Sequence, residues 1–185
     1  MGAWGVRTFE NDDALDWAGD FSDAPSTAKL AQTLAEAVGN SGYLDVSDGS
    51  NAVAAAEVVA AARGRPGADL PDGLLAWATS TPDVASPPLA AAALTALDRI
   101  TAADSELNEL WAETGDHHAW LGMVAELRSR LEASGGWLPS PRCATAGSAA
   151  EASRTRVAGR WRQHPRTRVR HESRPDRRPR GRTAG

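Results

Sequence analysis

The feature that most constrains the fold of this chain is a run of alanine and valine at residues 52–62, AVAAAEVVAAA, interrupted only by Glu57. Alanine has the highest helix propensity, and a helix that is apolar on nearly every face is normally buried between other helices. The residues from Asp48 to Asn51 offer N-caps for this helix, and Gly64 ends it. We therefore expect a central buried helix with several others packed around it.

Helical patterns occupy most of the sequence on either side of this run. The expected N-caps are Asn11, Ser26, Ser86, Ser105 and Asp116, and a further short helix is expected around residues 74–79. The stripes expected to face the core are Ala14, Trp17, Ala18 and Phe21; Leu30, Leu34 and Val38; Leu89, Ala93, Leu97 and Ile100; Leu107, Leu110 and Trp111; and Trp120, Val124, Leu127 and Leu131. Residues 43–46 are the only short strand candidate. The sequence predicts an all-α fold, a compact bundle of about six to seven short helices with an irregular N-terminal loop.

The distribution of charge divides the chain in two. Residues 1–136 contain seven Lys or Arg and 21 Asp or Glu, whereas residues 137–185 contain 13 Arg and three acidic residues. Arg, Pro, Ala, Gly, Ser and Thr make up 37 of the 49 residues of the second segment, which has no apolar period. Such a composition cannot bury enough apolar surface to offset its chain entropy. We expect an acidic all-α domain at 1–136 and a disordered tail at 137–185.

Two interpretations of the 137–185 segment are open. Its arginines are suited to binding nucleic-acid phosphates. Alternatively, the segment is a frameshifted end, because an alanine-rich chain with a single lysine indicates a GC-rich coding sequence. Such a sequence read in another frame yields many Arg, Pro, Ala, Gly, Ser and Thr codons.

Composition also excludes several kinds of partner and site. The acidic 1–136 domain repels nucleic acid and anionic membrane surfaces, so we expect neither as its partner. The single cysteine, Cys143, excludes an internal disulfide and a Cys-based zinc site. No apolar run reaches the roughly 20 residues that span a bilayer, and no signal peptide is visible. We expect a cytoplasmic protein, and no cofactor, because glycine-rich nucleotide-binding motifs and the nucleophile-elbow motif are absent.

The opening stretch MGAWGVRTFENDDALDW contains four carboxylates in seven residues: Glu10, Asp12, Asp13 and Asp16. The preferred interpretation is architectural, with Trp4 as an anchor of the N-terminus. Asn11 caps a helix whose first turn places Asp12 and Asp13 at the positive end of the helix dipole, while Asp13, Asp16 and Asp20 face solvent. The alternative is a magnesium or calcium site formed by the four carboxylates. The calcium-loop pattern D-x-[DN]-x-[DN]-G is absent, which disfavours this alternative.

Glu57 is the other candidate for chemistry. A carboxylate in the middle of a buried helix should either be paired or have a raised pKa. In the preferred interpretation, Glu57 accepts a hydrogen bond from an N-terminal loop amide or pairs with an arginine such as Arg7. In the alternative it is a general acid or base, although no nucleophile or second catalytic group is identifiable near it. His117 and His118 diverge by about 100° on a helix, so we expect solvated side chains at the helix start and no shared metal.

The opening MGAWG…FENDDALDW, the later AAAEVVAA and SELNELW, and the tryptophan-containing final helix resemble a bacterial family, the domain of unknown function 4259. The resemblance covers residues 1–134 approximately, and it implies a grouping without an activity. The Arg-rich 137–185 segment departs from what we expect of this family. The structural signature that we expect of the domain consists of Trp4, Phe9, Asn11, Asp12, Trp17, Glu57, Trp111 and Trp120.

Two classes of function are compatible with these observations. The preferred class is a small non-catalytic binding or regulatory module that acts through protein contacts, because the domain is acidic and lacks catalytic motifs. The alternative class is a carboxylate-based metal-binding protein or hydrolase-like enzyme that uses the N-terminal acidic cluster and Glu57.

Overall fold

The computed structural model describes residues 5–39 and 42–133. These ranges contain no strand and form seven α-helices and one 3-10 helix: α1 (Asp12–Asp23), α2 (Thr27–Gly39), α3 (Val46–Ala62), α4 (Asp72–Ser80), η1 (Pro82–Ala85), α5 (Pro87–Ile100), α6 (Glu106–Ala112) and α7 (His117–Glu132). The prediction of an all-α fold with an irregular N-terminal loop is therefore confirmed. No helix in these ranges is long and apolar enough to cross a membrane. The expectations for Trp4 and for residues 137–185 lie outside the described residues.

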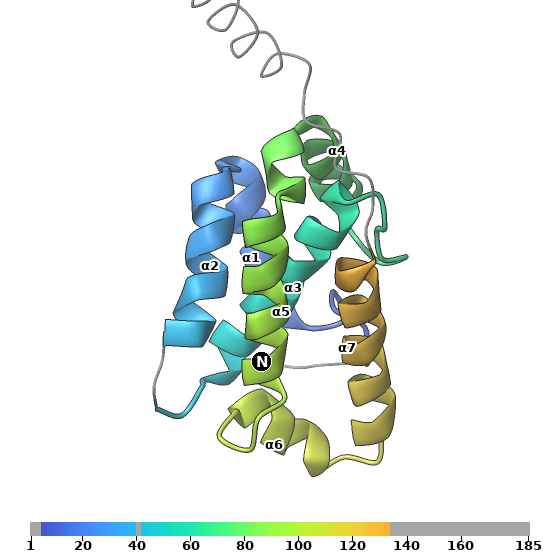
Figure 1. Ribbon diagram of the computed structural model, residues 1–185. Helices are drawn as coiled ribbons and strands as arrows, with labels where there is room; N and C mark the ends of the chain where they lie inside the picture. The colour runs from blue at the N-terminus through green and yellow to red at the C-terminus, as the bar shows by residue number, and fades with distance from the viewer. Residues whose placement is uncertain (1–4, 40–41, 134–185) are drawn as a thin grey trace, which may run out of the picture. The chain divides into compact units, whose positions relative to one another are not determined.

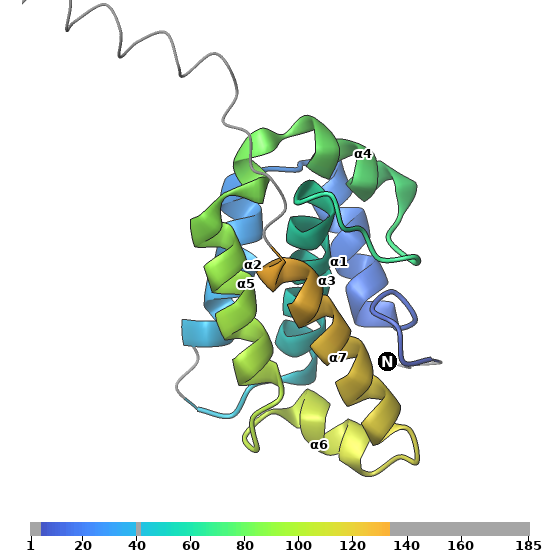
Figure 2. The ribbon, with the colours of Figure 1, turned by 45° about the vertical axis from the view of Figure 1, so that its right-hand side comes forward.

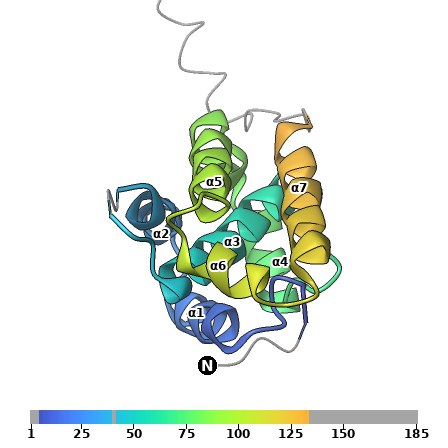
Figure 3. The ribbon, with the colours of Figure 1, turned by 90° about the horizontal axis from the view of Figure 1, so that it is seen from below.

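Helix α3 lies at the centre of this arrangement, and each of the other described helices packs against it (Figures 1 and 3). Every residue from Ala52 to Ala61 is buried, including Glu57. The small alanine side chains let the neighbouring helices approach closely, while larger side chains on those helices fill the space between them. The prediction of a central buried helix is confirmed.

The predicted start of this helix is wrong. Helix α3 begins at Val46, and the Asp45 carboxylate caps it by accepting a hydrogen bond from the Ser47 amide at 2.9 Å. The predicted caps at 48–51 lie inside the helix instead. Both Asp45 and the predicted residues are of types that favour N-caps, so residue type alone could not distinguish them.

The strand candidate at residues 43–46 contributes one isolated bridge, between Leu44 and Ser105. The Leu44 amide donates to the Asp104 carbonyl, and the Leu44 carbonyl accepts from the Glu106 amide, each at 2.9 Å. Leu44 is fully buried. The bridge holds α6 beside the start of α3, at the lower end of the domain in Figure 1.

The apolar stripes predicted for α1, α5 and α7 are buried. In α2 the prediction fails at Val38, which is exposed, while Thr33 and Ala37 are buried. Thr33 can face inward because its hydroxyl accepts a hydrogen bond from Trp17 Nε1 at 3.2 Å and is thereby satisfied. In α6, Leu110 is likewise exposed rather than buried.

Three segments that are far apart in the sequence lie next to one another beside α3. They are the N-terminal loop (residues 5–11), the loop between α3 and α4 (residues 63–71), and α7 (Figure 2). The Thr8 side chain lies within hydrogen-bond distance of residues on α3 and α7, and the Phe9 amide bonds to Asp69 of the second loop. These segments form the walls of the cleft described below.

Candidate functional site

The four N-terminal carboxylates do not converge on a common point. Glu10 accepts a hydrogen bond at 3.0 Å from a backbone amide three residues earlier in the N-terminal loop. Asp13 accepts one from the Ser47 hydroxyl at the start of α3, also at 3.0 Å. Asp12 and Asp16 are exposed. Across residues 5–39 and 42–133, no group of three or more His, Cys, Asp or Glu side chains could hold a metal ion.

The architectural interpretation of Asn11 is confirmed. Its Oδ1 accepts a hydrogen bond from the Ala14 amide at 2.8 Å, and Asp12 and Asp13 occupy the first turn of α1. The expectation that Asp13 faces solvent is wrong. Asp13 is half-buried because α1 packs against α3, and this packing brings its carboxylate to Ser47.

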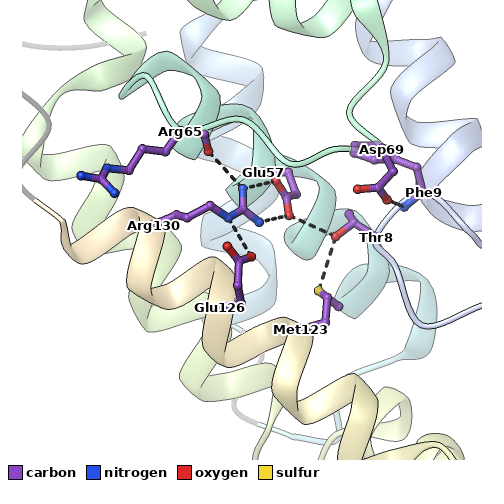
Figure 4. Close-up of polar contacts among 8 residues, drawn as sticks. All are labelled: Thr8, Phe9, Glu57, Arg65, Asp69, Met123, Glu126 and Arg130. Atoms are coloured by element: carbon purple, nitrogen blue, oxygen red, sulfur yellow. Dashed lines mark hydrogen bonds and ion pairs between the residues drawn. The ribbon is translucent and has the colours of Figure 1, made fainter.

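Glu57 is paired, as the structural interpretation predicted, but its partner is Arg130 of α7. The two terminal nitrogens of the Arg130 guanidinium donate to the two carboxylate oxygens of Glu57, Nη1 to Oε2 at 2.8 Å and Nη2 to Oε1 at 2.5 Å (Figure 4). Arg7, the arginine named from the sequence, is exposed, and within the described part of the chain it forms no hydrogen bond or ion pair with Glu57. The hydrogen bond from the N-terminal loop comes from the Thr8 hydroxyl, at 3.4 Å from Oε1, rather than from an amide.

Arg130 is held on three sides. Besides Glu57, its Nε donates to Glu126 at 2.8 Å, and its Nη1 donates to the Arg65 carbonyl at 3.1 Å. Burial by itself lowers the pKa of Arg130, but the hydrogen bonds and negative charges of Glu57 and Glu126 outweigh it and raise that pKa above its ordinary value. Arg130 is therefore charged, and the carboxylates of Glu57 and Glu126 compensate the burial of its guanidinium.

Sequence reasoning missed Arg130, although two signals point to it. Arg130 directly precedes Leu131 and follows Leu127 by three residues, so it flanks the apolar stripe of α7 that faces the core. Glu57 is the only charged residue of the alanine and valine run, and it therefore requires a cation on a neighbouring helix. Neither signal determines which helix packs beside residue 57, because that depends on the tertiary arrangement.

The loop between α3 and α4 closes over Glu57. A Cβ atom placed on Gly67 would lie 2.7 Å from Glu57 Oε2, which shows how closely the loop backbone approaches the carboxylate. Two residues later, Asp69 accepts a hydrogen bond from the Phe9 amide at 3.0 Å and joins this loop to the N-terminal loop. Glu57 is consequently only 2% exposed.

A cleft of about 510 Å³ lies between the two loops and α7. The N-terminal loop contributes Val6, Arg7 and Thr8; the second loop contributes residues 66–69; and Glu57, Met123, Glu126 and Arg130 complete the lining. In Figure 4 Glu126 lies below the Arg130 guanidinium, and Asp69 lies to the right, beyond Thr8. This cleft is far larger than the cavity of about 20 Å³ between the N-terminal loop, α3, α6 and α7, and it is our candidate functional site.

The cleft presents one hydroxyl group among charged side chains. Both oxygens of Glu57 are occupied by Arg130, and Thr8 is the only hydroxyl-bearing side chain in the described lining. The Thr8 hydroxyl is 3.4 Å from Glu57 and 3.7 Å from Met123 Sδ, which are long contacts for activating a nucleophile. The Thr8 hydroxyl and the Glu57 carboxylate are thus joined only by a long hydrogen bond, and both oxygens of that carboxylate are already bound by Arg130.

The remaining candidates are structural. His118 is exposed as expected, but His117 is half-buried, because its Nε2 bonds to Asn108 Oδ1 at 3.0 Å and its ring stacks on Trp120. Of the expected signature, Phe9, Trp17, Glu57 and Trp120 are buried, and Trp111 is partly buried and stacks on Trp120. Both tryptophans of this stack belong to the packing between α6 and α7.

Comparison with known proteins places the chain in a family. A family model described as "Domain of unknown function (DUF4259)" matches residues 2–122, which is well over half of the chain. Among curated proteins and among solved structures, none matches this chain. The matched range includes the capped start of α1, Glu57 and the loop that covers it, whereas Arg130 lies beyond its end. The chain thus belongs to the DUF4259 family of domains of unknown function.

Proposed function

We propose that this domain is a small non-catalytic binding module that acts through contacts between its acidic surface and a protein partner. The observation that carries the proposal is how the domain uses its few cations. Five of its seven basic side chains are engaged within the domain: Lys29 and Arg63 donate to backbone carbonyls, and Arg99, Arg128 and Arg130 form ion pairs. The cations therefore stabilise the fold and leave most of the 21 carboxylates to set the charge of the surface.

The outer face of α1 has the clearest excess of negative charge. Asp12, Asp16, Asp20 and Asp23 are exposed and follow one another at helical spacing, and the apolar Leu15 is exposed beside them. Like charges on neighbouring turns of a helix destabilise it slightly in isolation. A partner with complementary positive charge offsets this repulsion and is attracted over several ångströms at moderate salt.

The region around α6 adds apolar groups to an acidic surface. Tyr43 and Leu110 are two of the exposed large apolar side chains of the described residues. The Tyr43 hydroxyl donates to Glu109 at 2.5 Å, and this hydrogen bond, with the negative charge of Glu109, raises the pKa of Tyr43 to about 12. Exposed aromatic and apolar side chains next to fixed charges are typical of surfaces that contact other proteins.

The enzyme alternative receives less support. A general acid or base must exchange a proton with a substrate, and both oxygens of Glu57 are already held by the Arg130 guanidinium. Among the N-terminal carboxylates, Glu10 bonds within its own loop, Asp13 bonds to Ser47 of α3, and Asp12 and Asp16 are exposed. We also propose that the module works in the bacterial cytoplasm, since the resemblance is to a bacterial family and a single cysteine is typical of a reducing compartment.

Affinity capture from a bacterial lysate tests the proposal when it is done with two forms of the full chain. One is the wild type, and the other carries Asp16→Lys and Asp20→Lys on the exposed face of α1. We expect the wild type to retain a basic protein that the charge-reversed form loses. The purified partner should then bind the wild type less tightly as salt concentration rises.

Calorimetric titration with Mg²⁺ and with Ca²⁺ provides the opposing measurement. Micromolar binding of either cation that disappears in Asp13→Ala and Asp16→Ala would overturn the proposal in favour of a metal site. Retention of the same proteins by the wild type and by the charge-reversed form would equally contradict it.

A further inference from the structure

We propose that the cleft between the N-terminal loop, residues 66–69 and α7 receives a lysine or arginine side chain of the partner. This inference rests on the proposed function and specifies where the partner is recognised. The volume of the cleft, about 510 Å³, lies in the range of about 300–1,000 Å³ that is typical of ligand-binding pockets. It therefore has room for a long side chain and part of the backbone that carries it.

The most buried cation of the cleft is already paired with carboxylates. Arg130 is bound by Glu57 through both terminal nitrogens and by Glu126 through Nε. An anionic ligand could recruit Arg130 only by displacing one of these carboxylates. If Glu57 were displaced, a charge that is 2% exposed would be left unpaired. An anion is therefore disfavoured as the occupant.

Two carboxylates of the lining are prepared to bind a cation. Asp69 is held by the Phe9 amide through Oδ2, and Glu126 is held by Arg130 through Oε2. The second oxygen of each has no hydrogen bond among the described residues. The two groups lie on either side of the Thr8 hydroxyl in Figure 4. A carboxylate that is already fixed through one oxygen loses little further freedom when the other oxygen receives an ammonium or guanidinium group.

The rest of the lining suits the hydrocarbon part of such a side chain. Val6, Ala68 and Met123 line the same cleft and provide apolar surface from both loops and from α7. Lysine and arginine bury their methylene stems along apolar surface while their charged ends reach polar groups. Methionine also adapts its shape to a ligand more readily than branched side chains do.

Arg7 is the lining residue that opposes a basic ligand. Its side chain is exposed, so water and salt weaken its repulsion. Arg7 also makes the inference sharply testable. Removal of its charge must strengthen the binding of a cation, whereas removal of the charge of Asp69 must weaken it.

The test uses the full chain and fluorescently labelled hexalysine, with hexaglutamate as the anionic probe, followed by fluorescence anisotropy at low salt. Three charge-removing variants are compared with the wild type: Asp69→Asn, Arg7→Gln and Asp83→Asn. Asparagine at position 69 retains an acceptor for the Phe9 amide, so the variant changes the charge and leaves that contact in place. Asp83 is exposed on η1, belongs neither to the cleft lining nor to the acidic face of α1, and serves as the matched control.

We expect Asp69→Asn to weaken hexalysine binding about three- to fivefold, Arg7→Gln to strengthen it about twofold, and Asp83→Asn to change it by less than about twofold. Equal weakening by Asp69→Asn and Asp83→Asn would overturn the cleft as the site and leave the acidic binding module standing. Tighter binding of hexaglutamate than of hexalysine, lost in Arg7→Gln, would overturn the cationic ligand. Absence of hexalysine binding would also overturn this inference, while the capture experiment judges the proposed function separately.

Discussion

Two groups of carboxylates in this domain occupy opposite environments. The N-terminal segment Glu10–Asp16 has four carboxylates in seven residues; two are exposed, one bonds within its own loop, and one bonds to a serine hydroxyl of α3. Glu57 is the single charged residue in a run of alanine and valine, and it is 2% exposed. Its partner, Arg130, is 73 residues away in the sequence. In the conspicuous cluster Asp13 joins α1 to the start of α3, whereas the isolated Glu57 joins α3 to α7 and to the N-terminal loop.

The cost of removing a charge from water explains this difference. An exposed carboxylate is solvated wherever it lies, so several can share one segment with little consequence for stability. A buried carboxylate needs a partner of opposite charge and further hydrogen bonds. Around Glu57 these come from Arg130 and Thr8, with Gly67 allowing the covering loop to approach. Burial of a carboxylate, rather than the number of carboxylates near it in the sequence, therefore determines how many segments of the fold it holds together.

The largest expected effect comes from removing the buried partner. Arg130→Ala leaves Glu57 buried without a counter-ion, and we expect it to lower the free energy of unfolding by about 3–5 kcal/mol. Arg128→Ala is the matched control on the same helix, because its partner Asp98 is 70% exposed, and it should cost about 1 kcal/mol or less. Urea denaturation of the full chain, followed by circular dichroism, measures both.

A double substitution shows whether the loss reflects the unpaired charge. Glu57→Leu together with Arg130→Met replaces the ion pair by apolar side chains, and we expect it to recover most of the stability that Arg130→Ala removes. Equal losses in the free energy of unfolding for Arg130→Ala and Arg128→Ala would show that burial does not make the Glu57–Arg130 pair more important for stability than the exposed pair of Arg128.

The second prediction compares two glycines that lie against the two kinds of carboxylate. A Cβ on Gly5 would meet Glu10 Oε2 at 2.0 Å, and one on Gly67 would meet Glu57 Oε2 at 2.7 Å. Glu57 cannot move without breaking its pair, so Gly67→Ala should cost about 1–3 kcal/mol. The Glu10 side chain can rotate towards solvent and lose one hydrogen bond, so Gly5→Ala should cost about 1 kcal/mol despite the closer contact.

Thermal unfolding of both alanine variants tests this order, with Gly73→Ala as the control. A Cβ on Gly73 meets nothing within 4 Å, and alanine favours the helix there, so this variant should be neutral or slightly stabilising. If Gly5→Ala proved more destabilising than Gly67→Ala, Glu10 would be held as firmly as Glu57.

The third prediction concerns the cap of the N-terminal segment. Asn11→Ala removes the hydrogen bond to the Ala14 amide and should cost about 1 kcal/mol. Ser105 also occupies an N-cap position, but its buried hydroxyl has no partner in the described part of the chain. Ser105→Ala should therefore be neutral or stabilising. Opposite signs for these two alanine variants in urea denaturation would confirm that the hydrogen bond, and not the position, gives Asn11 its effect.

Much of the fold follows from patterns within single helices. The stripe of α1 from Ala14 to Phe21 and the stripe of α7 from Trp120 to Leu131 are buried as their spacing predicts. That Glu57 must be paired also follows from its neighbours alone. These inferences succeed because they depend on local periodicity and on the cost of burying charge.

The features that could not be predicted depend on contacts between segments. Seven cations in residues 1–136 are possible partners for Glu57, and only the packing of α7 beside α3 selects Arg130. In the same way, Asp45 caps α3 because the buried Leu44 pairs with the segment before α6 and fixes the backbone ahead of the helix. The cleft forms from two loops and one helix, and no local pattern in any of them indicates it.

The smallest expected effects belong to the N-terminal carboxylates. Asp16→Asn removes a like charge that lies one turn from both Asp12 and Asp20, so it should raise the free energy of unfolding by at most about 0.5 kcal/mol. Asp13→Asn loses a favourable charge in the first turn of α1 but keeps an acceptor for the Ser47 hydroxyl, so it should lower that free energy by about 1 kcal/mol or less. Both are measured by thermal denaturation at pH 7 and low salt in the presence of a chelator. Carboxylates held together for a ligand would repel one another in its absence, and neutralising either would then stabilise the domain substantially. An increase of more than about 1 kcal/mol in the free energy of unfolding of both variants would show that the N-terminal carboxylates repel one another strongly, as they do in an empty binding site. These carboxylates would then not differ from Glu57 simply by being solvated.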